Sequence, residues 1–290
     1  MSIIKWKKFF LELFALLVFV LFISPLLLIF INSAKSSREI LVNPLSLPEN
    51  WGQIWENFLT IWNNPSIDYP SSFLSSVIIT VTSLALISLV SSLAAWGLVR
   101  YKSKTSSLIF YMFVASMVIP FQVVMYPLIT WFRILSMNVT EPLMNFSLLR
   151  SYPGIILAYI GFGMGMSVFM FHGFLKGVPL EIEEAAEIDG ANKLQTFFYV
   201  VMPIMKPIYV TIIILNGIWI WNDFLLPMQL LGVGNDIQTL PIAISNFAGS
   251  YTKQWDMILS SSLMIMIPII IVFLFAQKQI LKGMVDGAIK

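Results

Sequence analysis

The chain has 290 residues, of which 58% are hydrophobic and 11% are charged, and its 17 basic and 15 acidic side chains give a net charge of +2. Its mean hydropathy of +0.85 is far higher than a water-soluble domain sustains, so the chain is predicted to be an integral membrane protein. The small net charge, without an acidic or basic tail, indicates no nucleic-acid partner, and the absence of cysteine excludes a disulfide framework and a thiolate metal site.

Six apolar segments are each long enough to cross a membrane. A bilayer core of about 30 Å needs about 20 helical residues. Segments of this length are Phe9–Ile31, Phe73–Val99, Ser107–Phe132, Pro153–Leu175, Ile208–Leu231 and Met257–Ala276. They are continuous rather than alternating, which favours helices over a β-barrel. We therefore expect an all-α, polytopic bundle of six transmembrane helices that forms one domain, residues 1–290.

The basic residues predict the orientation of this bundle. If the N-terminus is cytoplasmic and the chain changes sides at every crossing, twelve basic residues lie inside and five outside, as the positive-inside rule requires. The inside set is Lys5, Lys7, Lys8, Arg100, Lys102, Lys104, Lys176, Lys193, Lys206, Lys278, Lys282 and Lys290, and the outside set is Lys35, Arg38, Arg133, Arg150 and Lys253. Both termini and the loop of about residues 176–206 are then cytoplasmic.

The long outer loop, about residues 32–72, contains several prolines and the tryptophans Trp51, Trp55 and Trp62. Indole rings settle at the membrane surface, so this loop is expected to form short interfacial helices or turns. The only histidine, His172, lies near the cytoplasmic end of the fourth segment. It has no neighbouring ligand residues, and we interpret it as a packing or interfacial residue.

The cytoplasmic loop at 176–206 is unusually acidic. Glu181, Glu183, Glu184 and Glu187 follow Pro179, an arrangement that favours the start of a short helix. Gly190 is expected to end that helix in a left-handed turn. A second helix is predicted from Ala191 toward Met202, and Pro203 and Pro207 mark the start of the fifth span. The loop is therefore predicted to be a helix–turn–helix that projects from the membrane.

The same loop resembles a known family motif. Glu184-Ala-Ala, three residues, Gly190, nine residues and then Val200-x-Met202-Pro203 is similar to the EAA loop of ABC importer permeases, E-A-A-x3-G-x9-I-x-L-P, with conservative changes at the two hydrophobic positions. Further similarity to the carbohydrate-uptake, maltose-type subfamily lies in Trp221-Asn-Asp-Phe-Leu-Leu-Pro227, in Thr239-Leu-Pro241 and in the tail from Gln277 to Lys290. The likeness covers all six segments, although the loop at 133–152 is longer than the usual connector.

This resemblance implies a role and a set of partners. In such permeases the EAA loop is the coupling helix that docks on a cytoplasmic ATPase, and the matching residues here are Glu184, Ala185, Ala186, Asp189, Gly190 and Ala191. The implied partners are a second, non-identical permease, two ATPase subunits that bind the ATP, an external solute-binding protein and the membrane lipid. The implied location is the cytoplasmic membrane of a prokaryote. No cofactor and no enzymatic activity are expected of this chain, since it contains no phosphate-binding loop.

The solute pathway is predicted less directly. Candidate residues are polar or aromatic side chains in apolar segments, namely Gln122, Asn216, Trp221, Asn222 and Asp223. An acidic group at membrane depth is costly, which suggests a cavity or a partner for Asp223. A plain interfacial position for Asp223 is equally compatible with its place in the fifth segment. Gly161, Gly163 and Gly165 are expected to allow close helix approach.

Other functions have weaker support in the residues. An ion-gradient-driven carrier would not need the cytoplasmic EAA loop, and a membrane enzyme would need converging polar groups that this topology separates. Within the ABC class, a permease for another polar solute such as glycerol phosphate stays open, although a phosphate favours basic groups in the pathway. The sequence does not identify the solute, nor whether the second permease is a different chain.

Overall fold

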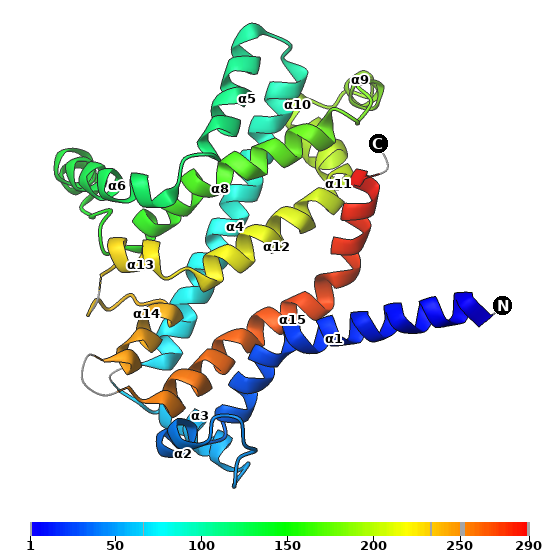
Figure 1. The fold of residues 1–290 in the computed structure, drawn as a ribbon. Coiled ribbons are helices and arrows are strands. Elements are labelled where there is room, and N and C mark those ends of the chain that lie inside the picture. Colours follow the sequence, from blue (N-terminus) through cyan, green and yellow to red (C-terminus); the bar gives the residue numbers. More distant parts are fainter. Residues whose placement is uncertain (1, 66, 233, 250–252, 289–290) are drawn as a thin grey trace. The chain divides into compact units, whose positions relative to one another are not determined.

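The computed structural model of the chain describes residues 2–65, 67–232, 234–249 and 253–288, and these contain helices and no strand (Figure 1). Lys290, one of the predicted cytoplasmic lysines and the last residue of the family-like tail, lies outside the described residues. The longer helices are α1 (Ser2–Asn32), α3 (Gln53–Trp62), α4 (Tyr69–Arg100), α5 (Lys104–Ser116), α6 (Phe121–Leu135), α8 (Tyr152–Leu175), α9 (Glu181–Ile188), α12 (Lys206–Asn222) and α15 (Trp255–Ala288). The shorter ones are α2 (Ser37–Val42), α7 (Glu141–Met144), α10 (Lys193–Thr196), α11 (Met202–Ile204), α13 (Leu225–Leu230) and α14 (Leu240–Ser245), with π-helical turns at Ser136–Thr140 and Phe197–Val201 and a 3₁₀ turn at Asn246–Ala248.

Five of the described helical stretches are long and apolar enough to cross a membrane, and a bent pair supplies a sixth if it is counted as one span. The predicted all-α polytopic fold is therefore confirmed. The first, second, fourth and sixth predicted segments fall within α1, α4, α8 and α15. The bent pair consists of Lys193–Ile204 and Lys206–Asn222, which meet at 76°.

The third predicted segment, Ser107–Phe132, is not one helix, and this prediction was wrong in its continuity. Helix α5 ends at Ser116 and α6 begins at Phe121. Pro120 precedes α6 with an extended backbone, φ −62° and ψ 134°. Proline supplies no N–H and disfavours a helical residue before it, so the break occurs here. The stretch of membrane length in this region is Phe121–Met144.

The fifth predicted segment, Ile208–Leu231, was also too long. Helix α12 ends at Asn222, and Asp223 is extended, with φ −72° and ψ 128°. The Asp223 Oδ1 accepts a hydrogen bond of 3.0 Å from the Leu225 N–H. Such a local side-chain bond stabilises a turn in competition with a helix, so the chain leaves α12 and restarts as α13. Asp223 therefore lies just beyond a helix end rather than inside a helix.

The chain divides into two compact units. One consists of the residues up to Pro70 with Ala243–Pro268, and the other of Ser71–Ile242 with the residues from Ile269 onward. Whether the chain behaves as the single predicted domain stays a prediction.

In the first unit, polar contacts join the outer loop to the ends of two helices. The expected short helices are present as α2 and α3. The Ser33 carbonyl at the end of α1 accepts hydrogen bonds from Asn57 Nδ2 in α3, at 2.9 Å, and from Ser260 Oγ in α15, at 3.0 Å. The Lys35 side chain is fully buried and donates to the Asn43 carbonyl at 2.9 Å. Because buried polar groups are costly unless paired, these bonds define the conformation of the loop.

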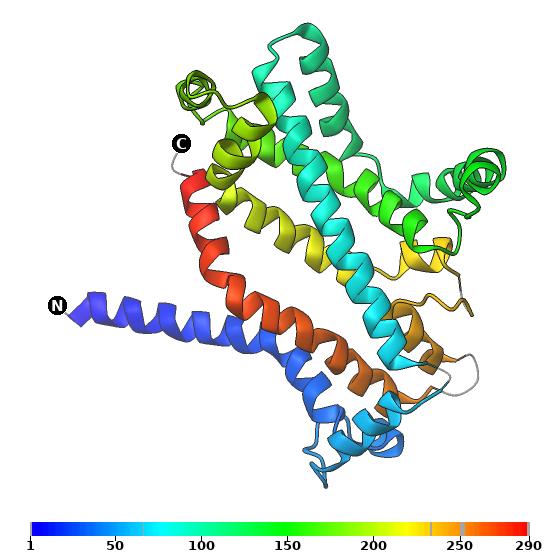
Figure 2. The same cartoon turned by 180° about the vertical axis from the view of Figure 1, so that it is seen from behind.

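In the second unit, α4 crosses α8 and α12, as Figures 1 and 2 show. Two clusters of buried side chains fill the crossings, one around Ile87, Tyr159 and Ile220 and one around Ala95 and Phe171. The unit is held together by side-chain packing along these three helices, as expected for helices in lipid.

Glycines in α8 allow some of these close approaches. A Cβ at Gly163 would lie 2.7 Å from Ile87 Cδ1, and one at Gly165 would lie 2.7 Å from Ser116 Oγ. At Gly161, in contrast, a Cβ would have nothing within 4 Å. The tightest place is Gly154, where a Cβ would lie 1.7 Å from the Leu148 carbonyl oxygen.

We predict that Gly154→Ala destabilises the protein by about 1–3 kcal/mol, the usual cost of overpacking, because the clashing atom belongs to the backbone and cannot rotate away. The matched control is Gly161→Ala in the same helix, which should be neutral or slightly stabilising since alanine favours a helix. Unfolding midpoints of the two purified variants in the same detergent measure the difference. Equal midpoints would contradict the packing described for Gly154.

Candidate functional site

The acidic loop between α8 and α12 folds as the predicted pair of helical arms. Its first arm, α9, begins two residues after Pro179 and carries Glu181, Glu183 and Glu184 in its first turn, where the helix dipole favours acidic side chains. Of the residues in the EAA motif, Glu184, Ala185, Asp189 and Gly190 are exposed and Ala186 and Ala191 are partly buried. Most residues of the motif are therefore on the surface of the second unit.

The end of α9 is a left-handed glycine turn, as predicted. Gly190 has φ +90°. The Ala191 N–H donates to the Ala186 carbonyl at 3.0 Å, and the Gly190 N–H donates to the Glu187 carbonyl at 3.0 Å. These two bonds form a Schellman motif, in which the last carbonyls of a helix are satisfied and a residue without Cβ is favoured at the turn. The spacing between the alanines and Gly190 thus has a direct structural reason.

The second arm starts at Lys193 rather than Ala191 and runs through α10, the π-helical turn and α11 to Ile204. Asn192 and Gln195 form a capping box at its start, with Asn192 Oδ1 accepting from the Gln195 N–H at 2.9 Å. Lys193 also forms an ion pair with Glu187 across the turn. The arm therefore has a defined beginning that is connected to α9.

The second arm is anchored in the bundle by apolar side chains. Phe197, Val201 and Met205 are fully buried in the cluster that includes Ala95 of α4 and Phe171 of α8. Burial of a large apolar side chain contributes about 1.5–3 kcal/mol. The arm is thus part of the packed bundle.

Glu183 joins α9 to the end of α4, and this contact was missed by the sequence analysis. Glu183 is only 4% exposed. Trp96 Nε1 donates to Oε2 at 2.9 Å, while Arg100 approaches Oε1 through Nε at 2.8 Å and through Nη2 at 2.6 Å. Arg100 Nη2 also donates to the Val178 carbonyl at 3.1 Å, just before α9. Charge-assisted bonds to one carboxylate position α9 against the last turn of α4.

The opposite face of α9 is exposed and partly apolar. Ile182 is 40% exposed and Ile188 is 86% exposed, and Ala185 lies between them in sequence. Exposed apolar side chains lower the solubility of a protein and often mark a surface that a partner covers. The helix thus has one face attached to the bundle through Glu183 and another that is available to a partner.

The five predicted pathway residues do not form one cluster. Gln122 is exposed in the first turn of α6. Asn216 is 1% exposed and donates from Nδ2 to Ser167 Oγ at 3.1 Å and to the Ile212 carbonyl at 3.0 Å, which is a packing contact between α12 and α8. Trp221 is mostly buried against Phe73, and Asn222 is exposed, with Nδ2 bonded to the Ile218 carbonyl.

Asp223 has the most distinctive surroundings of the five. Its Oδ2 accepts a hydrogen bond of 3.1 Å from the hydroxyl of Tyr159, which is fully buried in α8. The Tyr159 ring meets Trp219 edge to face, with 5.5 Å between ring centroids. Trp219 is 37% exposed, and Asp223 is half-buried. Carboxylate oxygens and aromatic faces are thus gathered at one end of α12.

Comparison with known proteins identifies the family. Residues 87–286 match the family described as binding-protein-dependent transport system inner membrane component. A probable starch degradation products transport system permease protein of Thermoanaerobacterium thermosulfurigenes is 34% identical over 98% of this chain and 97% of that protein. A diacetylchitobiose uptake system permease protein of Streptomyces coelicolor is 31% identical over 93% of this chain and 85% of that protein.

A solved structure shows the same fold. The crystal structure of a bacterial ABC transporter involved in the import of the acidic polysaccharide alginate contains a chain that is similar with a TM-score of 0.78 at 19% identity, covering 94% of this chain and 97% of that one. The family match extends over most of the chain and runs from the middle of α4 through both arms of the acidic loop to α15. The chain therefore belongs to the family of inner membrane components of binding-protein-dependent transport systems, and it is a multi-pass membrane permease.

Proposed function

We propose that this chain is the permease subunit of an ATP-driven ABC importer that carries a sugar or oligosaccharide across the cytoplasmic membrane. Two similar permeases support a carbohydrate, since their names refer to starch degradation products and to diacetylchitobiose. The observation that carries the proposal is the coupling loop, in which the EAA spacing coincides with a helix that ends in a Schellman turn and is attached to α4.

The proposed assembly contains this chain, a second and non-identical permease, two cytoplasmic ATPase subunits and an external solute-binding protein. ATP is bound by the ATPase subunits, and this chain contributes no cofactor site. The distribution of basic residues supports cytoplasmic termini, with the acidic loop on the cytoplasmic side, where an ATPase can reach it.

Alternating access would be driven through α9. The exposed face with Ile182 and Ile188 docks on the ATPase, and the buried Glu183 transmits the movement to Arg100 and Trp96 in α4. A short helix held at both faces moves as a unit, so a change in the ATPase biases the bundle toward one of two arrangements.

For the solute, the end of α12 at Asp223 is the best-supported contact. Sugars are bound by carboxylates that accept hydroxyl hydrogen bonds and by aromatic rings that lie against their apolar faces. Asp223 supplies a carboxylate and the partly exposed Trp219 supplies an aromatic ring, while the buried Tyr159 holds the Asp223 carboxylate through its hydroxyl. A purely interfacial role for Asp223 is the alternative.

The ATPase partner is tested through the turn at Gly190. The tagged chain, purified from its native membrane, should co-purify with an ATPase and a second permease. After reconstitution, this complex should take up oligosaccharides in the presence of ATP. Gly190→Val should lose the ATPase while still inserting, because a β-branched residue is strained at φ +90°. Gly190→Asn should retain more of the bound ATPase than Gly190→Val does, because asparagine tolerates a left-handed conformation. Transport without ATP by the chain alone would overturn the importer proposal.

The attachment of α9 is tested at Glu183. Glu183→Gln leaves Arg100, whose side chain is only 20% exposed, without its carboxylate. Removal of one partner of a buried ion pair costs about 3–5 kcal/mol, so oligosaccharide uptake should fall at least about tenfold while ATP hydrolysis continues. Glu181→Gln changes an exposed acid in the same turn and serves as the control. If both variants transport equally, force is not transmitted through Glu183.

The solute contact is tested with Asp223→Asn. Loss of the carboxylate should raise the KM for oligosaccharide uptake by about tenfold, the effect of about 1.4 kcal/mol of binding free energy, with normal amounts of protein in the membrane. Asp236→Asn removes an exposed acid elsewhere in this unit and should leave the KM unchanged. An unchanged KM in both variants would support the interfacial alternative.

A further inference from the structure

A basic cavity lies where three helices of the second unit meet at their ends. It has a volume of about 720 Å³ and lies between the end of α4, the start of α5 and the end of α8. Its lining includes Arg100, Lys102 and Lys104 around the turn between α4 and α5, and His172 of α8 with Lys176 directly after that helix. Since α4 and α8 have membrane-spanning length, their ends place the cavity at the boundary between lipid and water.

The charge of this cavity is one-sided. None of the described residues that line it is acidic. Arg100 is paired with Glu183, but the ion pairs formed within the described part of the chain do not include Lys102, Lys104 or Lys176. Like charges around one cavity repel each other, and an anion placed between them offsets that repulsion. The cavity is therefore suited to a negatively charged ligand.

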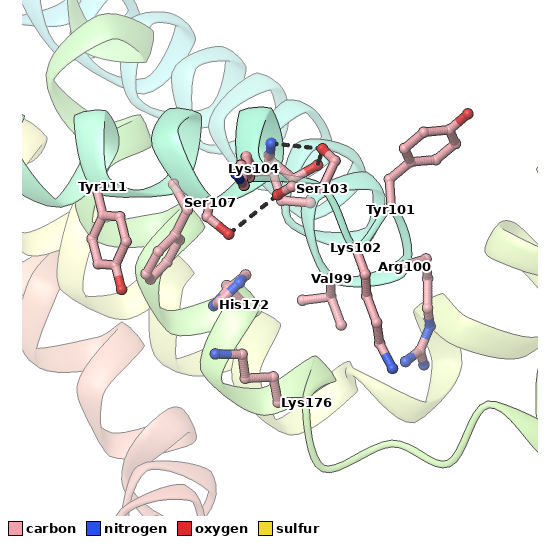
Figure 3. Close-up of a pocket in the computed structure, with 13 residues that line it drawn as sticks. Val99, Arg100, Tyr101, Lys102, Ser103, Lys104, Ser107, Tyr111, His172 and Lys176 are labelled. Atoms are coloured by element: carbon pink, nitrogen blue, oxygen red, sulfur yellow. Dashed lines mark hydrogen bonds between the residues drawn. The ribbon is translucent and has the colours of Figure 1, made fainter.

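Neutral hydrogen-bond donors lie beside the cations. Ser103 caps the start of α5, where its hydroxyl accepts the Ser106 N–H at 3.0 Å, and the hydroxyl oxygens of Ser103 and Ser106 are 3.0 Å apart. The Ser107 hydroxyl donates to the Ser103 carbonyl at 3.2 Å. Figure 3 shows the Ser107 hydroxyl pointing toward His172, and Lys176 on the same side of α8 as His172. One hydroxyl of the Ser103–Ser106 pair keeps its hydrogen for a ligand, and a hydroxyl beside ammonium groups suits the oxygens of a phosphate.

An aromatic stack forms one wall. His172 lies against Phe110, with 3.8 Å between ring centroids and 20° between the ring planes. His172 is 7% exposed, so the stack is packed into the bundle rather than free in solvent. The cations are therefore arranged around a rigid wall that keeps the cavity from collapsing.

The outer face of α5 is apolar directly next to this cavity. Leu108, Tyr111 and Met112 are each more than 60% exposed and recur at the three- and four-residue spacing of one helix face. Tyr111 also lines the cavity, so the charged and the apolar surfaces are continuous. A ligand with a phosphate at one end and hydrocarbon chains at the other matches both surfaces.

We propose that this cavity is a binding site for an anionic membrane lipid, with the lipid phosphate between Lys102, Lys104 and Lys176 and the acyl chains along Leu108 and Met112 of α5. Basic pockets at the ends of transmembrane helices attract anionic headgroups through charge and donor geometry. A free phosphate offers the same anionic chemistry but has no part that contacts the apolar face of α5.

The test uses the full chain as purified from its native membrane, stripped of native lipid and placed in neutral detergent micelles. Binding of phosphatidylglycerol carrying a fluorescent acyl chain is titrated, with phosphatidylcholine carrying the same chain as the neutral comparison. The triple variant Lys102→Gln, Lys104→Gln, Lys176→Gln is expected to raise the apparent Kd for phosphatidylglycerol at least about tenfold. Replacement of the same three residues by arginine should retain binding, which separates loss of charge from loss of fold.

The matched control is the triple variant Lys7→Gln, Lys8→Gln, Lys206→Gln, which removes the same charge from exposed lysines outside the cavity. Its apparent Kd should change by less than about twofold. Equal weakening in both triple variants would overturn the proposal in favour of unspecific surface attraction. Displacement of the lipid by millimolar inorganic phosphate, or equal affinity for phosphatidylcholine, would likewise overturn it. None of these measurements depends on transport, so the lipid-site proposal can be refuted without affecting the importer proposal.

Discussion

The buried carboxylate of Glu183 is the interaction on which the acidic loop between α8 and α12 depends. Helix α9 has only eight residues, too few to be stable alone in water, and its alanines and exposed isoleucines contribute little packing of their own. Its position is therefore determined by the bonds of Glu183 to Trp96 and Arg100. Once α9 is placed, the Schellman turn at Gly190 directs the second arm back toward the bundle, where Phe197 and Met205 are buried. The exposed face of α9 is a consequence of the same attachment, because the carboxylate occupies the other face.

Much of the fold could be predicted because a membrane imposes few solutions on an apolar segment. The segments that form α1, α4, α8 and α15 were identified from their apolar character and length. The left-handed turn at Gly190 followed from the chemistry of glycine. Prediction was poorer where a local feature interrupts a continuous apolar run. Pro120 divides the third segment, and the side chain of Asp223 forms a turn that ends the fifth. Hydropathy is averaged over a window of many residues, so a break caused by one residue does not change it noticeably.

In the acidic loop, the helix and its glycine turn could be predicted because they are local, whereas the contacts with other helices could not. The EAA spacing describes one helix and its turn, which are local. The partner of Glu183 lies more than eighty positions earlier in the chain, and only the crossing of α4 with the loop brings the two together. The same limit applies to Asn216, which was a candidate for the pathway because it is polar in a span. Its amide is occupied by Ser167 of a neighbouring helix, a contact with no sequence signal. Tyr159 was not predicted because its hydroxyl is distinguished only by the nearby Asp223.

The 76° bend between the second arm and α12 has a mechanical consequence. Met205, at the corner, is fully buried in the same cluster as Phe197 of the arm and Ile212 of α12, so the arm and α12 are packed together on both sides of the bend. The arm from Lys193 to Ile204 is about 18 Å long and α12 is about 25 Å long, at about 1.5 Å per residue. If the corner keeps its angle, a rotation of about 10° moves the Lys193 end by about 3 Å and the Asp223 end by about 4 Å, from the same rise per residue. A displacement at the Lys193 end of the arm would thus be accompanied by a slightly larger displacement at the Asp223 end, so the bend links the acidic loop to the far end of α12.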